Sequence, residues 1–217
     1  MQIFRPGANT IATLLLASIG VLPVLAVGLV YQIVGSSYVT AQNVTHDQPV
    51  PFSHEHHVSG LGLDCRYCHT SVEKARFAGM PPTETCMTCH SQLWTNAEML
   101  APVRASLAHE EPIHWQRANR LPAYVYFDHS VHVAKGVGCT TCHGPIGQMK
   151  LTRQSAPLTM QWCLDCHRNP AKALRPRQAV FDPDWKPAGD RAKSGDELTV
   201  AYHINAHHLT DCSICHR

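Results

Sequence analysis

The 217-residue sequence has few aromatic side chains, 7% of the total, and no cysteine outside one repeated pattern. So few aromatic rings cannot fill a core on their own, and we expect another kind of group to contribute to it. Basic residues are scattered and form no run, which argues against nucleic-acid binding. Little alternation of polar and apolar residues is present, so we expect few β-strands.

Charge is also missing near the N-terminus. No Lys or Arg stands between Arg5 and Arg66, and residues 11–34 form a run of 24 uncharged, mostly apolar residues. As a helix this run would be about 36 Å long, enough to cross a bilayer. A cleaved signal peptide is the alternative, but its apolar region would be shorter, about 7–15 residues. We expect a cytoplasmic stub over 1–10, a transmembrane anchor over 11–34 and a linker over 35–51.

The sequence is rich in two residue types, with ten cysteines and sixteen histidines, and every cysteine lies in a Cys-x-x-Cys-His motif. In this motif the two thiols add to the vinyl groups of a haem as thioethers, and the adjacent histidine reaches the iron. Zinc sites also use Cys-x-x-Cys pairs, but they need no histidine after every second cysteine. We therefore predict five haem c groups. The attachment cysteines are Cys65, Cys68, Cys86, Cys89, Cys139, Cys142, Cys163, Cys166, Cys212 and Cys215, and the proximal iron ligands are His69, His90, His143, His167 and His216.

The motifs belong to an internal repeat. A Phe-x-His-x-x-His element begins at Phe52, precedes two haem motifs, and recurs 75 residues later before two more. This pattern predicts a first two-haem module over 52–120 and a second over 121–170. A stretch rich in Pro, Lys, Arg and Asp follows, and we expect an extended surface linker over 171–200. The fifth motif then lies in a terminal segment over 201–217.

The sixth ligand of each iron separates electron transfer from catalysis, because an iron with six protein ligands cannot bind a substrate. Histidines spaced His-x-x-His project on nearly one helical face, where two imidazoles can serve two different haems. The predicted distal ligands of the two modules are His54, His57, His129 and His132. The distal ligand of the fifth haem stays open. It is either one of the adjacent histidines His208 and His207, with His208 preferred, or a methionine thioether. These candidates are His208, His207, Met149, Met160 and Met80.

The Phe-x-His-x-x-His elements with paired motifs resemble class III multihaem cytochromes c. Three strings are more specific: Phe-Arg-Pro-Gly-Ala-Asn-Thr, Gly-Leu-Asp-Cys-Arg-Tyr-Cys-His and Trp-Cys-Leu-Asp-Cys-His-Arg. With the N-terminal helix, they make the chain similar to the pentahaem subunits of bacterial alternative complex III. The resemblance implies a mainly α-helical domain with extensive loops around five haems, plus one transmembrane helix. It also implies a single-pass protein of the bacterial inner membrane with its haem domain in the periplasm.

The resemblance further implies partners. An iron–sulfur, molybdopterin-like subunit would donate electrons, integral membrane subunits would oxidise quinol, and a monohaem cytochrome c or terminal oxidase would accept the electrons. We predict no catalytic residues, because no acid–base constellation separate from the ligands is present, so the chain would be a relay and no enzyme on its own. One alternative is a membrane-anchored multihaem quinol dehydrogenase that oxidises quinol itself. Another is a pentahaem reductase of the kind that reduces nitrite, which usually keeps one open haem with an altered motif, whereas all five motifs here end in histidine.

Overall fold

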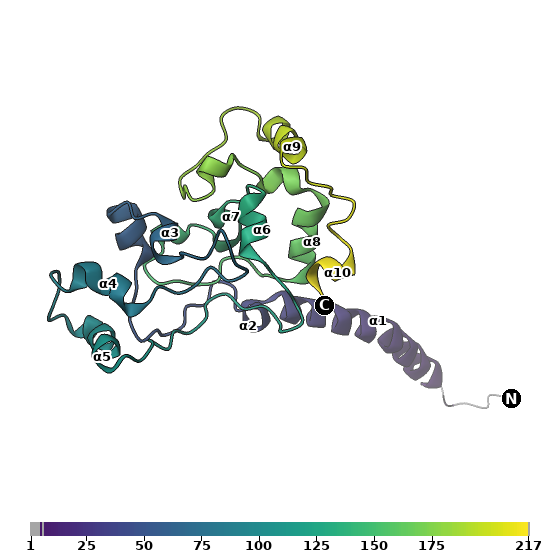
Figure 1. Ribbon diagram of the computed structural model, residues 1–217. Helices are drawn as coiled ribbons and strands as arrows, with labels where there is room; N and C mark the ends of the chain where they lie inside the picture. The colour runs from purple at the N-terminus through teal and green to yellow at the C-terminus, as the bar shows by residue number, and fades with distance from the viewer. Residues whose placement is uncertain (1–4, 6, 217) are drawn as a thin grey trace. The chain divides into compact units, whose positions relative to one another are not determined.

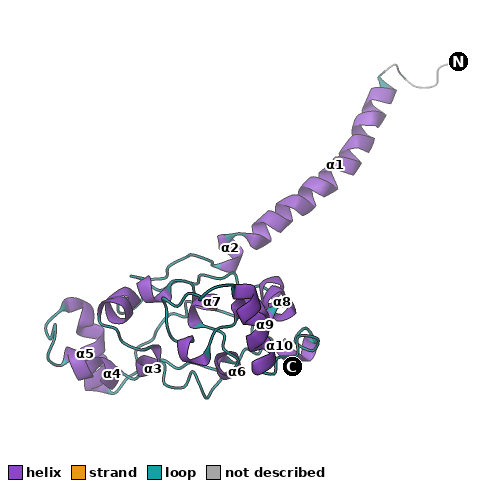
Figure 2. Ribbon diagram, turned by 90° about the horizontal axis from the view of Figure 1, so that it is seen from above, coloured by secondary structure: helices purple, strands orange, loops and turns teal. Residues whose placement is uncertain are grey.

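The computed structural model describes residues 5 and 7–216 of the chain. Among these residues it is built from helices and long loops, and no strand is present (Figure 2). Backbone pairing of the β type is limited to isolated bridges, such as the one between Val137 and Leu174. The prediction of a mainly helical fold with extensive loops is therefore confirmed.

The helices are short apart from the first, and Figure 1 labels the α-helices in chain order. The α-helices are α1 (Ala8–Gly35), α2 (Ser37–Thr40), α3 (Cys65–Cys68), α4 (Thr83–His90), α5 (Ala101–His109), α6 (His129–Ala134), α7 (Cys139–His143), α8 (Met160–Arg168), α9 (Arg191–Ala201) and α10 (Cys212–Cys215). A π-helical turn η1 (Glu55–Gly60) and 3₁₀ turns η2 (Glu98–Leu100), η3 (Ile146–Gln148), η4 (Pro170–Ala173) and η5 (Arg177–Ala179) lie between them.

Helix α1 is the predicted apolar segment. It has 28 residues with a mean hydropathy of 2.4 over its best window, and none of that window is buried. Pro23 lies inside the helix without ending it. By length and composition α1 can cross a membrane, and it extends the predicted span of 11–34 by a few residues at the N-terminal end. Together with α2 it forms a compact unit, Met1–Gln42, separate from the unit Asn43–Arg217.

The second unit is held by contacts between short helices and turns. Helix α9 packs on η4, η1 packs on η3, and α4 packs on α5. Its apolar core is small: Val50, Leu100 and Val103 form one cluster, with Met87 and Trp115 packed against it. Because so little apolar surface is buried by side chains, hydrophobic packing among side chains alone gives this unit limited stability.

The segment after the fourth motif is packed into the unit. Val180 is 1% exposed and Arg175 is 4% exposed. The Arg175 guanidinium donates to the carbonyl oxygen of Asp182 at 3.1 Å and to Thr140 Oγ1 at 2.9 Å. The sequence predicts an extended surface linker over 171–200, and the structure differs because this segment covers the third motif. Pro- and Lys-rich composition suggests exposure, but it cannot show that one arginine turns inward to satisfy buried carbonyls.

The buried guanidinium leads to a prediction about stability. A methyl group on Gly138 would overlap the guanidinium carbon of Arg175, so Gly138→Ala must displace a buried, hydrogen-bonded charge. We expect the free energy of unfolding to fall by about 1–3 kcal/mol, measured by thermal denaturation of the haem-loaded protein. Gly60→Ala is the matched control, since its nearest neighbour would lie at an ordinary 3.6 Å. Equal stability of the two variants would contradict this prediction.

Helix α1 leads to a second prediction. We expect the full chain to stay with membranes after an alkaline carbonate wash, because 28 residues of helix without Asp, Glu, Lys, Arg or His favour the hydrocarbon core. Replacing residues 8–35 by a cleavable export signal should move the protein to the soluble fraction. If the protein expressed from the unmodified sequence were instead released in a form shortened at its N-terminus, the helix would be a cleaved leader.

Candidate functional site

The cysteine pair of each Cys-x-x-Cys-His motif lies on one of the short helices α3, α4, α7, α8 and α10. A helical turn puts both cysteines of a motif on one face, where two thiols can reach one flat group. Side chains fix where two of these helices begin. Asp64 accepts a hydrogen bond from the Arg66 backbone N–H at 2.8 Å before α3, and Thr159 accepts one from Trp162 at 3.4 Å before α8. Over the described part of the chain, no three His, Cys, Asp or Glu side chains gather as a bare-metal site.

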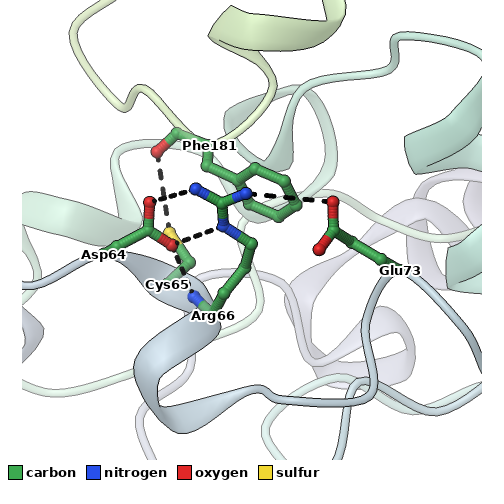
Figure 3. Close-up of polar contacts among 5 residues, drawn as sticks. All are labelled: Asp64, Cys65, Arg66, Glu73 and Phe181. Atoms are coloured by element: carbon green, nitrogen blue, oxygen red, sulfur yellow. Dashed lines mark hydrogen bonds and ion pairs between the residues drawn. The ribbon is translucent and has the colours of Figure 1, made fainter.

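The first motif is braced by its own second residue, as Figure 3 shows. Arg66 Nε lies 2.9 Å from Asp64 Oδ1, Nη1 lies 3.9 Å from Glu73 Oε1, and the guanidinium stands 4.5 Å over the Phe181 ring. The hydrogen bond from Arg66 lowers the pKa of Asp64. These groups are about half exposed, so the ion pairs add little stability. Their effect is to orient α3, whose Cys65 thiol donates to the Phe181 carbonyl oxygen at 3.7 Å.

The two Phe-x-His-x-x-His elements have nearly the same geometry, one in η1 and the loop before it, the other in α6 and the loop before it. Phe52 meets His54 edge-on at 4.9 Å between ring centres and stacks on His57 at 4.4 Å. Phe127 meets its first histidine edge-on at 4.8 Å and stacks on its second at 4.5 Å. The phenylalanine therefore locks both imidazoles of each element in place.

Three of the predicted distal histidines face a motif histidine. Metal–nitrogen bonds of about 2 Å on opposite sides of one iron place the two ring centres about 6 Å apart. The structure shows this spacing three times, so the residues present fit an iron bound between two imidazoles. The pairs are His57 with His90 at 6.3 Å and an interplanar angle of 66°, His129 with His143 at 6.3 Å and 5°, and His132 with His167 at 6.2 Å and 28°.

Hydrogen bonds at the other ring nitrogen set the chemical form of these histidines. A carbonyl oxygen only accepts, so Nδ1 carries the proton and Nε2 keeps a free lone pair for a metal. Seven of the predicted ligands make this bond. The pairs are His57 with Ser53 at 2.8 Å, His69 with Gly79 at 2.7 Å, His90 with Leu93 at 3.1 Å, His129 with Arg76 at 2.7 Å, His132 with Asp128 at 2.7 Å, His167 with Leu209 at 2.8 Å and His216 with Tyr124 at 3.2 Å.

His54 lies near the histidines of both the first and the third motif. Its pKa is lowered to about 4 by burial first and then by the neighbouring imidazoles of His69, His143 and His57. Its Nδ1 lies 3.0 Å from Thr152 Oγ1. Burial first, and then His129 and His69, lower the pKa of His143 to about 4 as well. Both rings are thus kept neutral, which is the form that binds iron.

The candidate distal ligands of the fifth motif lie in different surroundings. The His208 side chain is 73% exposed, and its Nδ1 lies 3.4 Å from Asp211 Oδ2. His207 bonds through its backbone N–H to Asn205 Oδ1 at 3.2 Å. Met149 is 2% exposed and lies inside the unit, where its carbonyl accepts from the Glu55 N–H at 3.0 Å. The ring of Tyr124 lies beside that of His216, with 5.8 Å between centres.

Contacts between cysteines place the first three motifs relative to one another. A hydrogen bond between the two thiols lowers the pKa of Cys65 and raises that of Cys139, so the first and third motifs touch. Burial first, and then the nearby thiol of Cys86, raise the pKa of Cys68, so the second motif also lies close to the first. A sulfur joined to haem as a thioether carries no proton, so these shifts indicate proximity rather than reactivity.

The remaining two motifs continue the same series. Burial raises the pKa of Cys142 to about 12, with Cys166 the next contribution, so the fourth motif adjoins the third. Burial also raises the pKa of Cys163, and Cys215 is the next contribution, so the fifth motif adjoins the fourth. The motifs therefore follow one another in space in the order second, first, third, fourth and fifth.

Sequence reasoning found the histidines and cysteines but missed the groups that orient them. The acceptors for the ligand imidazoles are backbone carbonyls, which every residue has, so no residue type marks them. Arg175 was also missed, because it stands in a stretch of ordinary surface composition. The phenylalanine of each repeat was visible in the sequence, but its stacking on the second histidine was not.

The chain is similar in sequence to known proteins. The family of cytochrome c7 and related cytochrome c matches residues 125–217, which hold the second Phe-x-His-x-x-His element and the last three motifs. The multihaem cytochrome c subunit of menaquinone reductase from Nitratidesulfovibrio vulgaris is 30% identical over an alignment of 144 residues, and the match covers 57% of this chain and 69% of that protein. Similarity to cytochromes c implies haem c as the cofactor of this chain and electron transfer as its role. The chain belongs to the multihaem cytochromes c.

Proposed function

We propose that this chain is an electron relay that holds five haem c groups in one row. The observation that supports it best is the set of imidazole pairs at 6.2–6.3 Å, which have the spacing that two ligands of one iron require. Bound haem iron supplies one-electron chemistry. A haem iron that has a protein ligand on each face has no free position for a substrate, so these sites favour electron transfer over catalysis.

The proposed ligand sets follow the repeat. In each His-x-x-His element the first histidine serves the first haem of its module, and the second histidine serves the other. His54 is the partner we propose for His69, because that imidazole is the first neighbour to contribute to its lowered pKa. For His216 we keep His208 as the first candidate, with His207 and Met149 as alternatives. Each element thereby joins two haems through one short turn.

The order of the motifs in space defines the two ends of the relay. The second and fifth motifs stand at the two ends of the series, and the first and third meet in the middle through Cys65 and Cys139. Close attachment points favour transfer between neighbouring haems, because each thioether fixes a haem edge next to its cysteine. We propose that donor and acceptor proteins reach the two end motifs.

The physiological setting we propose is a quinol-oxidising membrane complex. The related bacterial protein is a subunit of a menaquinone reductase, and α1 has the length and composition of an anchor. The resemblance to alternative complex III favours an iron–sulfur, molybdopterin-like donor subunit, integral membrane subunits that oxidise quinol, and a cytochrome c or oxidase as acceptor. The haem unit would then lie on the periplasmic side of the inner membrane.

The ligand pairs give a spectroscopic prediction. His132→Ala removes the ring that faces His167, so one of the five haems should change from low-spin to high-spin ferric iron in electron paramagnetic resonance. His109→Ala is the control, because His109 is exposed at the end of α5 and should leave the spectrum unchanged. An unaltered spectrum in His132→Ala, at full haem content, would count against the proposed pairs.

The relay role gives a kinetic prediction. The purified full chain should be reduced quickly by dithionite but not by a menaquinol analogue, because the described residues offer the quinol no reaction partner beyond the haem ligands. Addition of the membrane subunits should restore quinol-driven reduction. Rapid reduction of the isolated chain by quinol would favour the alternative, a multihaem dehydrogenase that oxidises quinol itself.

A further inference from the structure

One loop binds histidines of two different haem sites. The residues Ser71–Gly79 follow the first motif, and the carbonyl oxygen of Gly79 accepts from His69 Nδ1 at 2.7 Å. Three residues earlier, the carbonyl oxygen of Arg76 accepts from His129 Nδ1, also at 2.7 Å. His69 belongs to the first motif, whereas His129 faces the histidine of the third motif. The two acceptors therefore move with a single piece of backbone.

The loop is closed by its own hydrogen bonds. The Ser71 hydroxyl donates to the Phe77 carbonyl oxygen at 2.9 Å, and the Ser71 carbonyl accepts from Ala75 N–H at 2.8 Å. Gly79 has a φ of +82°, and a methyl group there would lie 2.7 Å from Ser71 Oγ. Val72 inside the loop is 7% exposed. A loop so constrained holds both carbonyls at a set spacing.

The arginine of the loop also supports the second repeat. Arg76 Nε donates to the Phe127 carbonyl oxygen at 3.4 Å, and its guanidinium stands 4.9 Å over the Tyr126 ring. Phe127 in turn touches His129 edge-on. Arg76 thus holds His129 in two ways, through its own carbonyl and through the phenylalanine that locks the ring.

We propose that Ser71–Gly79 is a shared positioning loop that sets the reduction potentials of the first and third haem sites together. A stronger Nδ1–H···O bond makes an imidazole a better electron donor, which stabilises ferric iron and lowers its potential. Because one loop carries both acceptors, a change in its shape alters both sites in the same direction. The inference rests on the ligand pairs proposed above, and it concerns the middle of the row, where the two modules meet.

The test is Gly79→Ala in the full haem-loaded chain. The added methyl meets Ser71 Oγ and should force the loop open, weakening the bonds to His69 and His129. We expect the midpoint potentials of the first and third sites to rise together in spectroelectrochemical titration, and their low-spin resonance signals to shift. The signals of the pairs His132–His167 and His57–His90 should stay in place. Signals are assigned from the losses seen in His54→Ala and His129→Ala.

Two further variants separate positioning from general damage. Gly189→Ala is the matched control, because Gly189 has the same φ of +82° and nothing lies within 4 Å of an added methyl. The double variant Ser71→Ala/Gly79→Ala removes the hydroxyl that the methyl meets and leaves the Ser71 Cβ position at 3.9 Å, so it should restore part of the change. Ser71→Ala alone should shift the midpoint potentials of both sites slightly in the same direction. This variant takes the place of Gly79→Ala in the test if Gly79→Ala does not accumulate.

The outcomes distinguish this inference from the proposed function. If the unmodified chain lacks low-spin signals for sites with two histidines, the ligand pairs fail and this inference fails with them. If those signals are present, a shift confined to one site, shifts of all sites alike, or no shift beyond that of Gly189→Ala overturns the shared loop alone. Parallel shifts of the first and third sites, with the others unchanged, support it.

Discussion

The hydrogen bond from a histidine Nδ1–H to a backbone carbonyl is the interaction on which the arrangement of this chain depends. It decides which ring nitrogen is free, and it aims that nitrogen away from the backbone toward a facing imidazole. The rest of the unit, with its small apolar core and long loops, serves to bring carbonyls such as those of Ser53 and Asp128 to the right places. The helices that carry the cysteine pairs of the motifs are short, and each carries one pair.

The arrangement that holds the histidines is repeated within the chain. The same turn, with a phenylalanine stacked on the second histidine, occurs twice and joins two motifs each time. What differs between the copies is the surroundings: the first element lies in a π-helical turn and the second in an α-helix. The first and third motifs then meet at Cys65 and Cys139, so neighbours in space are not neighbours along the chain.

The contact between the first and third motifs is where segments distant in sequence converge. The loop that carries Arg76 reaches the second element, and the segment around Arg175 packs between the first and third motifs. The Phe181 carbonyl contacts Cys65, while Val180 accepts from the backbone of Cys139. Two separate stretches of the chain therefore stabilise the contact between the first and third motifs.

Much of this protein is determined by local pattern. Five Cys-x-x-Cys-His motifs, two His-x-x-His elements and a long apolar run identify the cofactor type, the helical class and the candidate anchor, because each depends on residues within a few positions of one another. Only the tertiary structure decided which rings face each other, the order of the motifs in space and the packing around Arg175. These depend on loop paths and backbone carbonyls, and no residue type records where a carbonyl oxygen points.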